Sequence, residues 1–180
     1  MPRNQTHELA VENLYNALLR LMDQKPYREI SVTELASEAG VSRMAFYRNY
    51  QDKGEILIDH VERILRCYYQ KCQEIENLTE REMWVSFFLE MKNDIVVNYL
   101  RKAELMDTFI ELQKRYAEKL YRTVLHWNMD LPLNKMLLYQ RMGNMMGLLL
   151  YIADYPTEAD EQTLADQVLL MATTDSNRQQ

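Results

Sequence analysis

Residues 30–57 read ISVTELASEAGVSRMAFYRNYQDKGEIL, and two helix-start motifs lie close together in this stretch. Ser31 followed by Glu34 is a capping box, and the apolar residues behind it keep helical spacing up to a glycine. Ser42 then supplies a second N-cap, so another short helix is expected directly after the glycine, running to about Tyr50. Two short helices joined by a tight turn with glycine predict a helix-turn-helix.

Helical periodicity continues on both sides of this motif. Upstream, residues 6–23 place apolar side chains on one helical face, and Pro26 stops the helix just beyond. Downstream, Asp52 with Glu55 forms another capping box and opens a longer helix. The helix-turn-helix is therefore expected to stand between one helix that supports it and one that leads into the rest of the chain.

The remaining sequence also predicts helices. No segment alternates polar and apolar residues as a strand does, and breaks are expected near residues 101–104, 128–132 and 156–157. We therefore predict an all-α protein of about nine helices. A three-helix helix-turn-helix domain would occupy residues 1–53, and a helical bundle with a final helix after residue 157 would occupy residues 54–180.

The charge is distributed unevenly along the chain. The net charge is −6, which argues against a general nucleic-acid binder if the chain is taken as a whole. Residues 1–53, however, carry seven basic and seven acidic side chains, whereas residues 54–180 carry 14 and 20. The acidity belongs to the C-terminal part, which leaves the N-terminal part free to present a local positive face.

Several classes of protein are disfavoured. No Ser/His/Asp or Cys/His set, glycine-rich phosphate loop or paired-carboxylate motif is visible, so we expect no enzyme and no cofactor. The three histidines show no metal-ligand spacing, and the most apolar run is too short to cross a bilayer. Cys67 and Cys72 lie five residues apart in one expected helix, on different faces, so no disulfide joins them. A cytoplasmic protein without a membrane partner is expected.

The stretch at residues 30–57 resembles the TetR family of bacterial transcriptional regulators. The family pattern is a capped helix, an Ala-Gly-Val-Ser turn, a Phe-Tyr pair, an aromatic or apolar residue three positions later, and a lysine that opens the next helix. This sequence supplies these elements at matching intervals as Ser31, Ala39-Gly40-Val41-Ser42, Phe46-Tyr47, Tyr50 and Lys53. Tyr50 replaces the commoner Phe, and Met44 and Ala45 fall where members differ. The resemblance implies a homodimer that binds palindromic double-stranded operator DNA.

The expected third helix has one side suited to DNA. Phe46 and Tyr50, spaced i and i+4, pack beneath the turn, so the opposite side faces outward. In a major groove, arginine binds a guanine edge with two hydrogen bonds and an apolar side chain contacts a thymine methyl. The predicted base contacts are Arg43, Met44 and Ala45, and the predicted phosphate contacts are Thr33, Ser42, Tyr47, Arg48 and Lys53. The alternative for the arginines is an ordinary solvated surface.

Lys53 supports the phosphate interpretation. It falls in the first turn of an expected helix, where the helix dipole disfavours a cation by roughly 0.3–1 kcal/mol. A DNA phosphate bound at the same helix N-terminus would reverse this penalty. We therefore predict that Lys53 clamps a phosphate, as the family resemblance also implies.

The C-terminal part has features of a dimerisation and sensing domain. Gly143 and Gly147 would let another helix approach closely, and the predicted dimer face combines them with Leu164 and Val168; an ordinary crossing within the chain is the alternative. The resemblance also implies a pocket for a small-molecule effector. Its predicted lining is Trp84, Phe88, Met91, Phe109, Tyr116, Tyr139, Met142 and Met146, each of which could equally be plain core.

Two functions remain open at this stage. The first is a repressor that a small apolar or amphipathic effector releases from its operator. The second keeps the fold but makes the protein a co-regulator whose C-terminal domain senses a protein partner. The sequence does not distinguish repression from activation, because that depends on the position of the operator.

Overall fold

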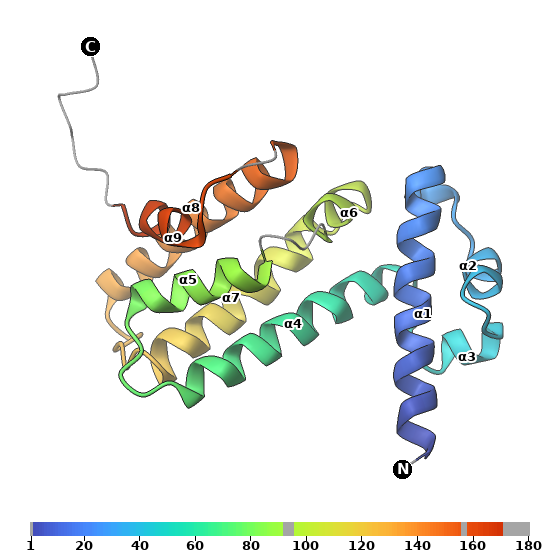
Figure 1. Cartoon of the computed structure of the whole chain (residues 1–180), viewed down its shortest axis with the longest axis horizontal. Coiled ribbons are helices and arrows are strands. Elements are labelled where there is room, and N and C mark those ends of the chain that lie inside the picture. Colours follow the sequence, from blue (N-terminus) through green and yellow to red (C-terminus); the bar gives the residue numbers. More distant parts are fainter. Residues whose placement is uncertain (1, 92–95, 156–157, 171–180) are drawn as a thin grey trace. The chain divides into compact units, whose positions relative to one another are not determined.

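The structure, a computed structural model, describes residues 2–91, 96–155 and 158–170. Within these ranges the regular secondary structure consists of nine α-helices and one short 3-10 helix (Figure 1). The predicted all-α fold, with an N-terminal helix-turn-helix and a helical C-terminal part, is therefore confirmed. The chain divides into two compact units, of which the first comprises Met1–Arg66 with Ile95–Gln113 and the second Cys67–Asp94 with Lys114–Gln180.

The first unit contains the helix-turn-helix. Its elements are α1 (Pro2–Gln24), the 3-10 helix η1 (Tyr27–Glu29), α2 (Val32–Glu38), α3 (Arg43–Tyr47), the first part of α4 (Gly54–Glu74), α6 (Val96–Lys102) and the first part of α7 (Met106–Thr123). α2 packs against both α1 and α3, and Figure 1 shows α2 and α3 on the same side of α1. Leu14, Leu18 and Leu35 are fully buried there and form the core of the motif.

Both predicted N-caps of the helix-turn-helix are present. Ser31 Oγ accepts the amide hydrogen of Glu34 at 3.2 Å, and Ser42 Oγ accepts that of Ala45 at 3.0 Å. Between the two helices Gly40 adopts φ +68°, a left-handed conformation that glycine reaches without the Cβ penalty of other residues. The turn therefore depends on this glycine.

α3 is shorter than the sequence predicted. It ends at Tyr47 rather than near Tyr50. The side-chain amide of Asn49 donates to the carbonyl oxygen of Ala45 at 2.8 Å. In a continuing helix this oxygen would instead accept the backbone amide hydrogen of Asn49. α3 is in consequence a short helix of five residues.

The start of α4 is tightly packed. Asp52 Oδ1 accepts the amide hydrogen of Gly54 at 2.6 Å, while the carboxylate of Glu55 accepts that of Gln51 at 2.7 Å, one residue away from the expected capping-box partner. A Cβ atom on Gly54 would lie 3.1 Å from the hydroxyl of Tyr27. Any larger residue at this position would require its neighbours to shift, so glycine favours the close approach of α4 to η1.

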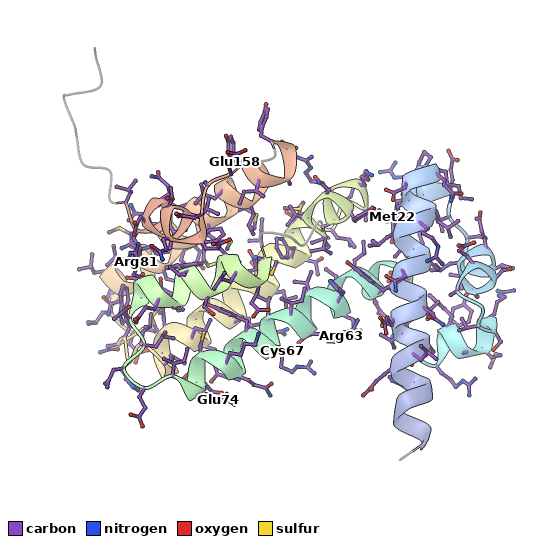
Figure 2. All side chains as sticks on the ribbon, in the orientation of Figure 1. Met22, Arg63, Cys67, Glu74, Arg81 and Glu158 are labelled. Atoms are coloured by element: carbon purple, nitrogen blue, oxygen red, sulfur yellow. The ribbon has the colours of Figure 1, made fainter. Side chains whose placement is uncertain are left out.

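The second unit is a helical bundle. It comprises the remainder of α4 and α7 together with α5 (Glu80–Met91), α8 (Pro132–Asp154) and α9 (Glu161–Leu169). α9 packs mainly on α5 and also on α8. Arg81 of α5, labelled in Figure 2, pairs with Asp166 of α9 at 2.6 Å, an exposed contact between these two helices.

The predicted breaks between helices are largely confirmed. α6 ends at Lys102 and α7 begins at Met106, as expected from the split near residues 101–104, and α8 begins at Pro132. The last helix begins only at Glu161, because the side chain of Asp160 caps it by accepting the amide hydrogen of Thr163 at 2.7 Å. The predicted loop at residues 156–157 lies outside the described residues. The assignment of functions to residues 1–53 and 54–180 stays a prediction.

Other expectations concern single chemical features. Cys67 and Cys72 are both free thiols, the first exposed and the second buried, as predicted. Among the helices that the structure describes, none is long and apolar enough to cross a membrane. In the same ranges no three His, Cys, Asp or Glu side chains gather as metal ligands.

Candidate nucleic-acid interface

The inner side of α3 is aromatic and buried. Phe46 is fully buried, and its ring lies 6.2 Å from that of Tyr50. The hydroxyl of Tyr50 donates a hydrogen bond to Asp59 of α4 at 2.8 Å, and burial together with this carboxylate raises the pKa of Tyr50. Tyr50, which stands in place of the commoner phenylalanine, therefore links the segment after α3 to α4.

The outer side of α3 gathers four of the predicted DNA contacts. Arg43, Met44, Tyr47 and Arg48 are all exposed, and Met44, at 70% exposure, contributes an apolar side chain that the protein leaves in solvent. Arg48 Nε donates to the carbonyl oxygen of Met44 at 3.2 Å, which orients its guanidinium along the helix. Among the described residues no acidic side chain pairs with Arg43. This side therefore presents positive charge beside an apolar contact point.

Three predicted contacts lie at helix starts. Thr33 is exposed in the first turn of α2, Ser42 is exposed and caps α3, and Ala45 is half-buried. Of these, Ala45 presents the smallest surface. The amide groups at the two helix N-termini are the partners that phosphate oxygens find in proteins, so Thr33 and Ser42 stand where a phosphate could bind.

The acidic side chains of α2 are paired with Arg20 of α1 and with Lys25, which directly follows α1. Lys25 Nζ donates to both carboxylate oxygens of Glu34, at 2.6 and 2.5 Å, and this contact lowers the pKa of Glu34. Arg20 pairs with Glu38 at 2.9 Å. These pairs offset the negative charge next to α3, so the arginines of α3 determine the local potential.

Lys53 has partners within the protein that its sequence position did not indicate. Its Nζ donates to the carbonyl oxygens of Tyr27 and Ile30, each at 2.6 Å, and lies 4.3 Å from the centre of the Tyr27 ring. Partial burial lowers the pKa of Lys53. An ammonium group has three donor hydrogens, so two are used here and one is left for an anion. The two carbonyl oxygens therefore stabilise the positive charge of Lys53 beside the N-terminus of α4 in the absence of DNA.

Sequence reasoning missed Tyr27 and Gly54. Tyr27 supplies both a carbonyl oxygen and a ring to Lys53, and its hydroxyl lies against Gly54. No periodic pattern marks Tyr27, because its role depends on a residue 26 positions away. Gly54 could have been found, since a glycine in the first turn of a predicted helix lowers helix propensity and needs another reason.

The predicted effector-pocket residues do not all share one environment. Seven belong to the second unit, and Phe109 belongs to the first, where it is fully buried. Trp84, Phe88, Met91 and Met142 are buried, whereas Tyr116 and Met146 are half-buried. Tyr139 is 55% exposed. The second unit also has an open cavity of about 480 Å³ at the ends of α4 and α7, and none of the predicted residues lines it.

The predicted dimer residues fall into two groups. Gly143 and Gly147 are exposed on α8, and a Cβ atom built on either would meet nothing within 4 Å. Leu164 and Val168 of α9 are instead buried within the second unit. The open face of α8 carries further exposed apolar side chains, namely Leu133, Met136, Tyr139 and Tyr151.

A buried polar cluster in the second unit was also missed. Arg141 is 6% exposed, and its guanidinium donates to Glu80 and to the carbonyl oxygen of Leu169, each at 3.1 Å. Tyr121 donates to the same carboxylate of Glu80, and burial together with this charge raises the pKa of Tyr121. The signal for this cluster was the single arginine within the apolar stretch of α8.

The comparison with known families agrees with this geometry. Residues 14–59 match the family described as bacterial regulatory proteins, tetR family. The matched part includes α2, the glycine turn, α3 and the start of α4, and thus the predicted DNA contacts from Thr33 to Lys53. No curated protein matches the chain. The match covers residues 14–59, so this part of the chain is a helix-turn-helix of the kind found in bacterial regulatory proteins of the tetR family, which supports a DNA-binding transcriptional regulator.

Proposed function

We propose that the protein is a homodimeric repressor that binds palindromic operator DNA and is released by a small apolar or amphipathic effector. The observation that supports operator binding most directly is the division of α3 into a buried aromatic side and an exposed side with two arginines and a methionine. Residues 1–53 would serve as the DNA-binding domain and residues 54–180 as the regulatory domain. Operator binding would take place in the cytoplasm, and it involves no catalysis.

The proposed reading of bases rests on the start of α3. Arg43 stands in its first turn without an acidic partner among the described residues, so its guanidinium is available for a guanine edge. Met44, next to it, would contact a thymine methyl, and the small side chain of Ala45 would allow α3 to approach the groove closely. These three residues would discriminate between sequences.

The remaining candidates would hold the DNA backbone. Tyr47 offers an exposed hydroxyl and Arg48 an exposed guanidinium, while Thr33 and Ser42 stand at helix N-termini. Lys53 would offer its third donor hydrogen, oriented by the two carbonyl oxygens that hold the other two. Contacts of this kind fix the register on the duplex and carry no sequence information themselves.

The dimer is proposed to form through the open face of α8. One helix-turn-helix reads about one half-site, so high specificity calls for two copies. Gly143 and Gly147 leave room for another helix to approach closely, and the exposed apolar side chains beside them provide surface to bury. Leu164 and Val168 would support this face from beneath through their burial in the second unit.

The effector is proposed to be apolar or amphipathic because the candidate lining residues are aromatic side chains and methionines. Binding would shift the population toward a dimer whose two recognition helices no longer fit the operator. Tyr139 fits this role least, because its exposure places it with the face of α8.

A protein partner is the second candidate signal. It is favoured by the apolar side chains that α8 exposes, since a surface of this kind serves protein–protein contacts as readily as dimerisation. In that case the face would bind a different chain. A mass measurement on native purified protein distinguishes a small-molecule effector from a protein partner, because a retained small molecule supports an effector.

Operator binding is tested by selecting bound duplexes from a randomised pool with the full chain. We expect an enriched palindrome whose half-site centres lie about 34–36 Å apart, or a multiple of this distance. Enrichment of no sequence, under salt conditions where the protein still binds DNA, would contradict sequence-specific regulation.

A further inference from the structure

Helix α6 is bonded to the end of α1, and the turn between α6 and α7 is bonded to η1. Tyr99 donates its hydroxyl hydrogen to Asp23 at 2.8 Å, and Lys102 Nζ lies 3.8 Å from the same carboxylate. Arg28 of η1 donates two hydrogen bonds to Glu104, at 2.5 and 2.6 Å. All five residues belong to the first unit, and we refer to them together as the α6–α7 latch.

The latch combines one buried anchor with exposed charges. Tyr99 is 5% exposed, whereas the side chains of Arg28 and Glu104 are 78% and 69% exposed. Exposed ion pairs are screened by water and salt and contribute little individually. The Arg28–Glu104 pair can therefore separate without exposing apolar surface, whereas Tyr99 adds a buried hydrogen bond to Asp23.

The turn holds Glu104 in an unusual backbone conformation. Glu104 has φ +61°, in the left-handed region that residues with a Cβ rarely adopt. The amide hydrogens of Ala103 and Leu105 bond back to Tyr99 and Leu100, each at 2.9 Å, and so enclose it. In this strained conformation Glu104 does not continue the helix, and its carboxylate faces Arg28.

The other side of η1 holds a candidate DNA contact. The carbonyl oxygens of Tyr27 and Ile30, at the two ends of this short segment, bind Lys53 Nζ. The hydroxyl of Tyr27 and a methyl carbon of Leu105 both lie close to Gly54, so that a Cβ atom there would come within 3.1 and 3.2 Å of them. One 3-10 turn therefore joins the α6–α7 turn to the start of α4.

We propose that the α6–α7 latch controls DNA affinity by holding η1 in the shape that positions Lys53 for a phosphate. With the latch closed, both carbonyl oxygens orient the ammonium group. Displacement of the α6–α7 turn breaks the contacts to Asp23 and Arg28, loosens η1 and weakens DNA binding. The proposal rests on the proposed phosphate contact of Lys53, and the five latch residues act on DNA only through it.

The test compares Tyr99→Phe with a matched control, Tyr69→Phe. Both tyrosines are buried, and the hydroxyl of Tyr69 lies 3.0 Å from Thr123 Oγ1 in the second unit. We expect Tyr99→Phe to speed amide hydrogen exchange in residues 27–30 and to weaken binding to the selected palindromic duplex by about 3- to 10-fold, as loss of one hydrogen bond would. Equal effects of the control, or unchanged exchange in residues 27–30, would overturn the latch.

Two further variants separate the latch from simple destabilisation. Arg28→Glu is expected to weaken duplex binding, and adding Glu104→Arg is expected to restore it by re-forming the pair with reversed charges. In a Lys53→Ala background, Tyr99→Phe is expected to cause no further loss of affinity. Absence of rescue, or full additivity with Lys53→Ala, would contradict the proposal. If Lys53→Ala alone leaves the affinity unchanged, the phosphate contact fails, while hydrogen exchange in the free protein still reports whether the latch holds η1.

Discussion

Arg43 and Lys53 place positive charge near the same motif, yet their surroundings give them different tasks. Arg43 is exposed at the start of α3 and has no acidic partner among the described residues. Lys53 is half-buried and already bound to two carbonyl oxygens. A side chain free to adopt a bidentate geometry suits a base edge, whereas one fixed by its own protein suits the uniform phosphate backbone.

Arg43→Ala is therefore expected to relax sequence preference. Loss of a bidentate contact to guanine costs about 1–3 kcal/mol of discrimination at one base pair in each half-site. Binding to a panel of single-base operator variants measures this directly. Arg48→Ala serves as the comparison and should weaken binding to every variant alike. An unchanged preference profile for Arg43→Ala would show that α3 reads bases without this residue.

Lys53→Ala is expected to weaken binding to all duplexes and to flatten its salt dependence. Removing one phosphate contact lowers the slope of log K against log salt by about one per subunit, because fewer counterions are released. Lys71→Ala, which removes a lysine that pairs with Glu90 in the second unit, should leave the slope unchanged. Since Lys53 also holds η1, a urea titration must accompany the measurement; a loss of stability with an unaltered slope would restrict Lys53 to a structural role.

Among the helices, the tight turn before α3 depends on backbone conformation more than on packing. A Cβ on Gly40 would meet nothing within 4 Å, so no clash forbids a larger residue. The φ of +68° disfavours any other residue at this position, since an L-residue in this conformation costs roughly 1–2 kcal/mol. The geometry between α2 and α3 is thus fixed by one dihedral angle.

Gly40→Ala is accordingly expected to lower the free energy of unfolding by about 1–2 kcal/mol. Gly40→Asn should cost less, because asparagine tolerates the left-handed region better. Urea denaturation of both variants gives the comparison. Equal losses for alanine and asparagine would mean that the left-handed φ angle does not set the preference for glycine at this position.

The helices and their caps were largely predictable, whereas the contacts that join distant segments were not. Ser31 and Ser42 cap helices through residues three positions away, so local sequence contains the whole interaction. The partners of Lys53 lie 23 and 26 positions away, and Arg28 and Glu104 lie 76 apart. Such pairings follow from tertiary packing, and no periodic pattern encodes them. The premature end of α3 shows the same limit, since a side-chain hydrogen bond overrode helical spacing.

For the whole molecule, charge and symmetry together set the conditions for operator binding. Residues 54–180 account for the net charge of −6, so a duplex is repelled by most of the chain and attracted only near α3 and Lys53. One subunit offers few phosphate contacts. A second copy would double them and bring a second α3 to a symmetric half-site, which is why dimerisation and affinity are expected to change together.

Gly147→Leu is expected to convert the proposed dimer to a monomer without unfolding the chain. The open space around Gly147 accommodates the larger side chain within one subunit, but a leucine would keep a partner helix from close approach. Sedimentation velocity at micromolar concentration should then show the monomer mass, with unchanged helical circular dichroism and weaker duplex binding. Glu74→Leu, which adds an exposed leucine to α4 (Figure 2), is the control and should remain dimeric. A Gly147→Leu protein that stays dimeric and binds DNA normally would move the interface away from this face of α8.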